Sequence, residues 1–202
     1  MDNRFAIWGI GDSGRNIFCK LSLMGRVECW YNEEHEGEYL YNCPIKKYEK
    51  DKKRETIVIA ENNWTQIYKI LKDNGLQIVD DFLPAWMLNS KMIGWRNFAL
   101  LDSQDRKKCL LHIKKERKIA IMYGNCQTEL IQRFLGQSEE FISKYIIINI
   151  PRVCQENKKT WDEIISMGLF PFCDLFIYQV VADDNRFGEH RATSNLLSRF
   201  SK

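Results

Sequence analysis

Two segments of this chain share one design, in which a short buried strand leads through a tight turn into an amphipathic helix. In the first, residues 5–8 are followed by Gly9-Ile-Gly11-Asp-Ser-Gly14 and a helix over 15–24. In the second, residues 118–123 lead into Gly124-Asn-Cys-Gln127 and a helix over 128–135. Such strand–turn–helix units build parallel sheets with helices packed on them. The sequence therefore predicts an α/β fold with two parallel-sheet units in tandem.

The first unit is expected to span residues 1–85. Runs of apolar and β-branched residues predict three further strands, at 27–31, 56–60 and 76–79. A helix that Asn62 or Asn63 can cap is predicted to end near Gly75, while the polar stretch 32–54 shows no clear helix. Residues 81–89 are predicted to form a short helix around Pro84.

The second unit is expected to span residues 118–202. Strands are predicted at 145–150 and 174–178, and helices at 161–167 and from Arg191. The helix over 128–135 is predicted to turn inward its four apolar residues, Leu130, Ile131, Phe134 and Leu135. An α/β unit of this kind usually continues with a further strand, so we expect the chain to be shortened at its end.

Residues 86–117 are predicted to be a basic connector that packs on both units. Residues 86–118 hold nine basic and three acidic side chains, whereas the net charge of the whole chain is only +3. That total is too small to indicate nucleic-acid binding. The block is either a solvated surface or a basic shelf that attracts a phosphate-bearing cofactor. Lys114, Lys115 and Lys118 are its candidate phosphate contacts.

Composition excludes several other classes of protein. The seven cysteines are odd in number and include no Cys-x-x-Cys pair, which argues against a disulfide scaffold or a zinc site. No apolar run is long enough to span a membrane, and the start of the chain lacks a secretory signal. We therefore expect a cytoplasmic protein, with its oligomeric state left open.

Gly9, Gly11 and Gly14 have the spacing of a dinucleotide-binding fingerprint between a strand and a helix. Such glycines permit a tight turn and bring a phosphate close to the helix N-terminus. The acidic residues that would hold the ribose, Glu33 and Glu34, come slightly late in the sequence. The turn therefore predicts either a nucleotide or nucleotide-sugar site or a packing turn without a ligand.

Cys126 lies where a strand ends and a helix begins. This position favours the thiolate form, and the free N–H groups of the first helical turn can face an oxyanion. Asn125 can donate a further hydrogen bond, so the pattern fits a nucleophile as well as a buried thiol at a turn. His190 is the best candidate for the base, because His35 and His112 lie in an acidic loop and in the basic block.

Residues 117–200 resemble the WcbI-type family of polysaccharide-biosynthesis acetyltransferases. The resemblance rests on Ile119-Ala-Ile-Met-Tyr-Gly-Asn-Cys-Gln127, on Cys173-Asp-Leu-Phe-Ile-Tyr-Gln179 and, less specifically, on Arg191-Ala-Thr-Ser-Asn-Leu-Leu197. It implies an SGNH-hydrolase-like fold that binds coenzyme A, with Cys126 in the place of the hydrolases' serine. It also implies that Gly124, Asn125, Gln127 and Gln179 line one pocket.

Residues 4–80 resemble the small Rossmann-like modules attached to bacterial sugar-modifying and methyl-transfer enzymes. The matching segments are 6–14, 30–33 and 57–60. This second resemblance implies a fold more than an activity. The resemblance to the WcbI-type family implies an enzyme that transfers an acetyl or related acyl group from coenzyme A to a sugar. In this mechanism Cys126 forms a thioester or lies against the thioester carbonyl, with the backbone N–H groups of Cys126 and Gln127 at the oxyanion. The alternatives are a non-catalytic nucleotide-binding module and an SGNH-like esterase.

Overall fold

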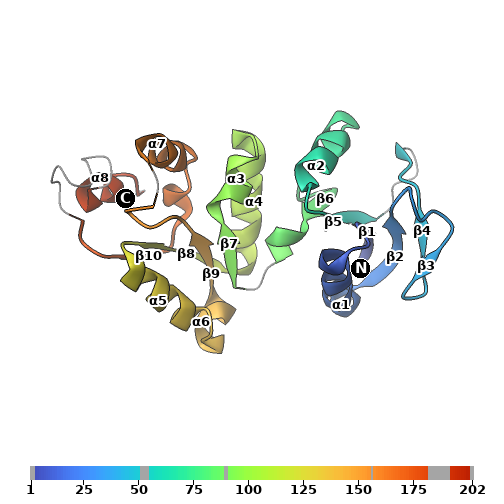
Figure 1. The fold of residues 1–202 in the computed structure, drawn as a ribbon, viewed down its shortest axis with the longest axis horizontal. Helices are drawn as coiled ribbons and strands as arrows, with labels where there is room; N and C mark the ends of the chain where they lie inside the picture. Colours follow the sequence, from blue (N-terminus) through green and yellow to red (C-terminus); the bar gives the residue numbers. More distant parts are fainter. Residues whose placement is uncertain (1–2, 51–54, 89–90, 156, 182–191, 201–202) are drawn as a thin grey trace. The chain divides into compact units, whose positions relative to one another are not determined.

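A computed structural model describes residues 3–50, 55–88, 91–155, 157–181 and 192–200 (Figure 1). The chain divides into two compact units, residues 1–88 and 89–202. Each unit has its own sheet and its own helices. The prediction of two α/β units in tandem is confirmed.

The first sheet has the strand order β3-β4-β2-β1-β5-β6. Its strands are β1 (Arg4–Trp8), β2 (Arg26–Tyr31), β3 (Tyr39–Leu40), β4 (Cys43–Lys46), β5 (Thr56–Ile59) and β6 (Phe82–Pro84). All neighbours pair in parallel except β3 and β4, which form an antiparallel hairpin within the polar stretch 32–54. The two residues between them, Tyr41 and Asn42, both have positive φ, as the turn of a two-residue hairpin requires. The sheet is therefore mixed rather than wholly parallel.

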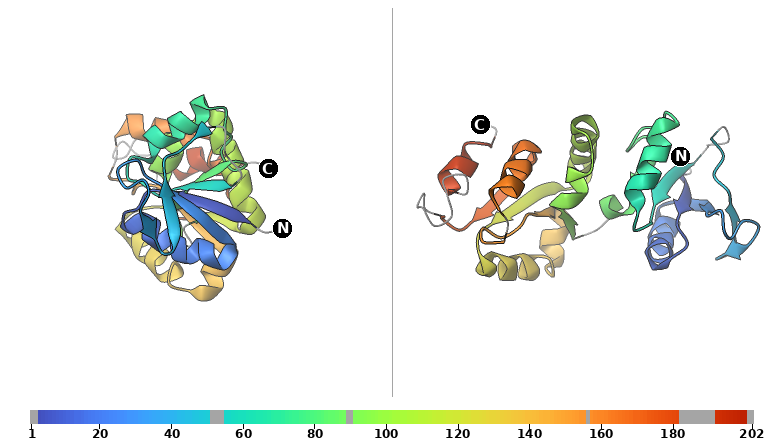
Figure 2. Two further views of the ribbon diagram at one scale, coloured as in Figure 1. Left: turned by 90° about the vertical axis from the view of Figure 1, so that its right-hand side faces the viewer. Right: turned by 45° about the horizontal axis from the view of Figure 1, so that its top comes forward.

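Two helices cover the first sheet on opposite faces, as Figures 1 and 2 show: α1 (Asp12–Met24) and α2 (Trp64–Asp73). Apolar residues of β1 and β5, such as Ile7 and Val58, are fully buried beneath them. Trp30 of β2 is also fully buried, and its ring stacks on Phe18 of α1 with the centroids 5.6 Å apart. Burial of these large side chains supplies most of the stabilisation of the unit.

The predicted strand over 76–79 is wrong. Val79 has a φ of 75°, a left-handed conformation that ends an extended run, and Ile78 forms only an isolated bridge to Phe82. The next strand of the sheet is β6, and Pro84 closes it rather than starting a helix. A short 3-10 helix, η2 (Ala85–Leu88), follows.

The second sheet has four parallel strands in the order β10-β8-β9-β7. The strands are β7 (Met92–Gly94), β8 (Lys118–Tyr123), β9 (Tyr145–Asn149) and β10 (Leu175–Tyr178). In both figures α5 (Cys126–Leu135) and α6 (Glu139–Lys144) lie on one face of this sheet. On the other face lie α3 (Trp95–Ala99), α4 (Ser103–Glu116) and α7 (Lys158–Ser166). A 3-10 helix, η3 (Phe170–Phe172), precedes β10, and α8 (Thr193–Leu197) is the last helix.

The segment expected to be a basic connector, residues 86–117, folds instead as part of the second unit from β7 onward. β7 is an edge strand of the sheet, and Cys109, Leu110 and Ile113 of α4 are buried. The guanidinium of Arg106 donates to the backbone carbonyls of Phe98, Leu101 and Met167. Part of the basic block is therefore structural, and burial lowers the pKa of Arg106.

The outward face of α5 also contradicts the sequence prediction. Leu130, Ile131 and Phe134 are 55%, 44% and 73% exposed, and Thr128 is the buried residue of this helix. Thr128 Oγ1 lies against Gly124, directly after β8, so a polar residue rather than the apolar ones marks the side of α5 that packs on the turn.

Asp174 joins three elements at the amino end of the second sheet. One of its carboxylate oxygens accepts a hydrogen bond from Lys114 Nζ of α4 at 2.7 Å, and the other accepts from the Ile119 N–H of β8 at 2.9 Å. Burial alone would raise the pKa of Asp174, but the hydrogen bonds from Lys114 and Ile119 outweigh it and hold the pKa below its ordinary value.

Asp174→Asn should lower the free energy of unfolding at neutral pH by about 1–3 kcal/mol, because the charged hydrogen bonds are lost. A lowered folded-state pKa contributes stability that is present above the unfolded-state value, about 3.9, and is lost as the pH falls through the folded-state value. Thermal melts between pH 7 and pH 3 should therefore show a smaller loss of stability toward acid in the variant than in the parent. Asp162→Asn, on the outside of α7, is the control and should leave the profile unchanged. Equal acid sensitivity of the two variants would contradict the role of Asp174.

Candidate active site

The connections of the second sheet diverge at the carboxyl ends of β8 and β9. After β8 the chain passes through α5 and α6 to β9, and after β9 it returns through α7 to β10 on the far side of β8. Since α5 and α7 cover opposite faces of the sheet (Figure 1), the two loops separate and leave a crevice between them. Ligands of open α/β sheets bind at such a crevice.

A cavity of about 610 Å³ occupies this position. That volume is within the range of small-molecule binding sites. Its apolar wall is formed by Met92, Trp95, Met122 and Ile150, from or next to the ends of three strands. Its polar lining includes Gly124 and Asn125 of the predicted site.

Close packing fixes the turn between β8 and α5. A Cβ atom at Gly124 would lie 2.1 Å from Thr128 Oγ1 and 3.0 Å from Gln179 Cβ, so no other residue fits without displacement. The Asn125 N–H donates to Gln179 Oε1 at 3.2 Å. The Asn125 side chain caps the helix by accepting from the Gln127 N–H at 2.9 Å. The turn is therefore held by one hydrogen bond within it and by one to Gln179, which follows β10.

Cys126 is the first residue of α5, and its side chain is exposed. It does not line the crevice, although Asn125 beside it does. The exposure separates Cys126 from thiols such as Cys109, which is buried and whose pKa is raised to about 12 by that burial and by nearby Asp105. The expected oxyanion donor at Gln127 is wrong, because its N–H already donates to the Asn125 cap.

Three arginines, Arg96, Arg133 and Arg152, line the crevice with a single carboxylate, Glu129. Glu129 accepts from Arg133 Nη2 at 2.7 Å and from Arg152 Nη2 at 2.8 Å. The Arg96 guanidinium lies over the Trp95 ring, 5.4 Å from its centroid. Guanidinium groups pair well with phosphates and carboxylates, so this lining suits an anionic ligand.

No motif of the sequence identified these arginines as site residues. They come from α3, from α5 and from the loop after β9, and only the fold brings them together. One signal was available for Arg152, which follows Pro151 directly after a predicted strand, at the edge where parallel sheets bind ligands.

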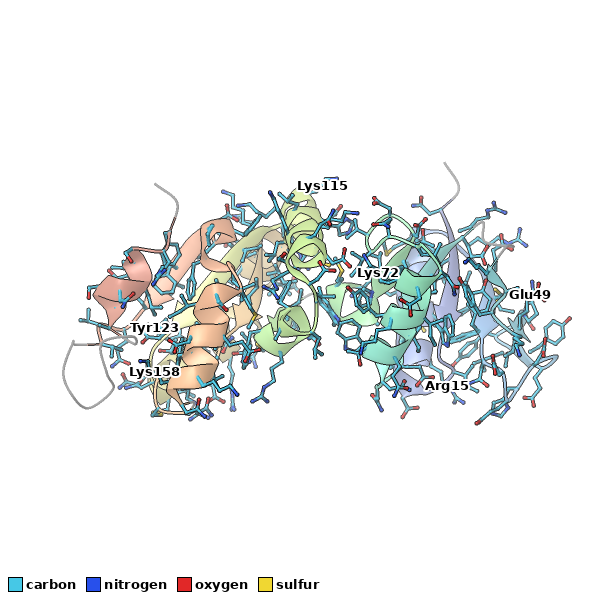
Figure 3. All side chains as sticks on the ribbon, turned by 90° about the horizontal axis from the view of Figure 1, so that it is seen from above. Arg15, Glu49, Lys72, Lys115, Tyr123 and Lys158 are labelled. Atoms are coloured by element: carbon cyan, nitrogen blue, oxygen red, sulfur yellow. The ribbon has the colours of Figure 1, made fainter. Side chains whose placement is uncertain are left out.

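Lys114, Lys115 and Lys118 do not reach this crevice. Lys118 begins β8, and Gly124 follows its last residue, so about 20 Å of extended chain separates them. Lys114 and Lys118 line a separate hollow of about 280 Å³ at the amino end of the strand. Lys115 extends from α4 well away from Tyr123 at the carboxyl end of β8 (Figure 3). The structure therefore does not place these candidate phosphate contacts at the crevice beside Gly124.

Gln127 and Gln179 contact Asn125 by hydrogen bonds but are not among the residues that line the crevice. His190, the candidate base, lies outside the described residues. Catalysis by His190 therefore remains a prediction from the sequence.

The three glycines of the turn in the first unit differ in what surrounds them. Gly9 has a φ of 118°, and a Cβ at Gly14 would lie 2.0 Å from the Gly9 carbonyl oxygen. A Cβ at Gly11 would meet no described atom within 4 Å, so the backbone there is open to a ligand. These are the three roles of the fingerprint glycines: tight turn, close approach and helix packing.

The charges around this turn oppose a phosphate. Glu61 lies over Gly9, with its carboxylate 2.7 Å from the position of an added Cβ, and Asp12 begins α1. Glu33, one of the late acidic residues, forms an ion pair with Lys47 at 3.6 Å. The backbone of the turn leaves room for a nucleotide phosphate, whereas the negative charges around it would repel one.

Comparison of the chain with protein-family models and with curated proteins finds no match. None of the described helices has the length and apolar character needed to cross a membrane. The assignment of a function therefore rests on the geometry of the sites and on the motifs of the sequence.

Gly124→Ala should lower the free energy of unfolding by about 1–3 kcal/mol, because the new methyl group overpacks the turn against Thr128. The double variant Gly124→Ala with Thr128→Ala should regain part of this loss, because the nearest atom is removed. Denaturant unfolding followed by circular dichroism measures both effects. Additive losses in the double variant would show that the contact with Thr128 is not the cause.

Proposed function

We propose that this protein transfers an acyl group from a coenzyme A thioester to a sugar hydroxyl, and that the second unit holds the site. The observation that carries the proposal is the arginine-lined crevice directly beside the turn that holds Cys126. The acyl group, the sugar and the role in surface-polysaccharide synthesis come from the resemblance of residues 117–200 to the WcbI-type family.

The crevice supports binding of a phosphate-bearing donor. It lies where α/β sheets bind ligands, it has the volume of a cofactor site, and Arg96, Arg133 and Arg152 supply positive charge. The apolar wall, with Trp95, offers a surface for a flat ring or an alkyl chain. A coenzyme A molecule combines these phosphate, ring and chain components.

Cys126 supplies the chemistry in this proposal. Its thiolate attacks the thioester carbonyl, the acyl group moves to the Cys126 sulfur, and coenzyme A leaves as the thiolate. The acceptor hydroxyl then attacks the acyl-cysteine, loses its proton to a base, and releases Cys126. The helix N-terminus and the Cys126 N–H stabilise the oxyanion of each step, and the Asn125 amide group is a second donor at the same turn.

Calorimetric titration with coenzyme A should show saturable binding of one molecule to the full chain. Cys126→Ala should keep this binding and reduce acyl transfer by at least about a thousand-fold, because the nucleophile is removed. Cys154→Ala, which removes another exposed thiol of the same unit, is the matched control and should keep the activity. Unchanged transfer by Cys126→Ala would exclude the covalent route.

A second candidate function is binding of a nucleotide or nucleotide-sugar by the first unit, favoured by the open backbone at Gly11. If a nucleotide phosphate approaches there, Gly11→Ala should weaken binding of NAD or a UDP-sugar by tenfold or more, while the melting temperature stays unchanged because the added methyl group meets no described atom. Titration of the parent and variant with both ligands tests this. Equal affinities, or no binding by the parent chain, would remove the second candidate.

A further inference from the structure

Glu129 holds together two arginines that belong to different elements. Arg133 lies one turn further along α5, and Arg152 lies in the loop after β9. The two oxygens of the Glu129 carboxylate are divided between them, with Oε1 2.7 Å from Arg133 Nη2 and Oε2 2.8 Å from Arg152 Nη2. All three side chains line the crevice.

The arrangement leaves most guanidinium donors available. A guanidinium has five N–H bonds. Within the described part of the chain, the side chains of Arg133 and Arg152 hydrogen-bond or pair only with Glu129. A long arginine side chain has many rotamers, and a shared carboxylate restricts two of them at once. The remaining donors of both groups are thereby presented from one place on the wall of the crevice.

We infer that Glu129 is a positioning residue, which sets Arg133 and Arg152 as a paired clamp for a doubly charged phosphate monoester. The inference rests on the proposed function and names the part of the ligand that the clamp binds. In coenzyme A the 3′-phosphate is a monoester with nearly two negative charges at neutral pH, whereas each diphosphate group carries one. Each of the two guanidinium groups can donate paired hydrogen bonds to the oxygens of such a monoester.

The direction in which Glu129→Gln changes the affinity for coenzyme A distinguishes a positioning role of Glu129 from a purely electrostatic one. Glu129 is negative, so its carboxylate by itself repels an anionic ligand. If Glu129 only contributed its charge, Glu129→Gln would strengthen the binding of coenzyme A. If Glu129 positions the two arginines, the same substitution weakens the binding, because the clamp loses its alignment.

The test is calorimetric titration of the full chain with coenzyme A, with dephospho-coenzyme A, which lacks the 3′-phosphate, and with adenosine 3′,5′-bisphosphate. The parent should bind coenzyme A at least tenfold more tightly than dephospho-coenzyme A. Glu129→Gln should lose at least fivefold in affinity for coenzyme A and for the bisphosphate, with little change for dephospho-coenzyme A. Arg152→Ala should have the same selective effect.

Glu140→Gln is the matched control, because it removes the same charge from an exposed residue that does not line the crevice. It should leave all three affinities unchanged. Equal or tighter binding of coenzyme A by Glu129→Gln would overturn the inference, as would a parent chain that does not discriminate between coenzyme A and dephospho-coenzyme A. Melting curves of each variant establish that a loss of affinity is not a loss of fold.

The outcomes separate this inference from the proposed function. If the parent binds the bisphosphate but not coenzyme A, and Glu129→Gln abolishes that binding, the clamp stands and the acyltransferase proposal fails. If coenzyme A binds without dependence on the 3′-phosphate or on Glu129, the acyltransferase proposal stands and the clamp fails. If the parent binds none of the three ligands, both fail.

Discussion

The second unit depends on a contact that leaves no room for a side chain. At Gly124 the end of β8 passes so close to Thr128 and Gln179 that an added Cβ would lie 2.1 Å from the Thr128 hydroxyl. This contact seats the first turn of α5 directly on the end of the strand. Cys126 is consequently exposed at the helix start, and Glu129, about one turn later, reaches the crevice. The same packing holds the start of α5, with Cys126 on it, at the end of β8.

In the first unit a glycine also permits a helix to pack closely on the turn before it, but the charges around that turn differ. Gly14 packs α1 against the Gly9 carbonyl and the Trp30 ring, where an added Cβ would lie 2.0 Å and 3.1 Å from its neighbours. The carboxylates of Asp12 and Glu61 lie near the glycine turn of the first unit, whereas three arginines line the crevice of the second unit. Two turns of the same design thus differ in the charge that they offer to a ligand, and the second is the better site for an anion.

The strands that carry both sites could be predicted because they are buried on both faces. Segments such as 5–8, 56–60 and 118–123 are nearly continuous runs of apolar residues, the pattern of a central parallel strand. The outer strands of the two sheets were harder to predict. Residues 76–79 have the composition of a strand, but the positive φ of Val79 ends the extended run. β7 has only three residues, which is too short for a clear sequence pattern. The inward face of α5 was mispredicted because its apolar residues do not mark the sheet side; Thr128 does.

The two strand–turn–helix starts, their glycines and the place of Cys126 at a helix N-terminus could be predicted from the amino-acid sequence, because these are local patterns of neighbouring residues. Which charged groups meet depends on the tertiary structure. It separated Lys114 and Lys118 from the turn at Gly124 by the length of a strand, although they lie near it in the sequence. It brought Arg96, Arg133 and Arg152 to one crevice, because the carboxyl ends of parallel strands gather loops that are distant along the chain.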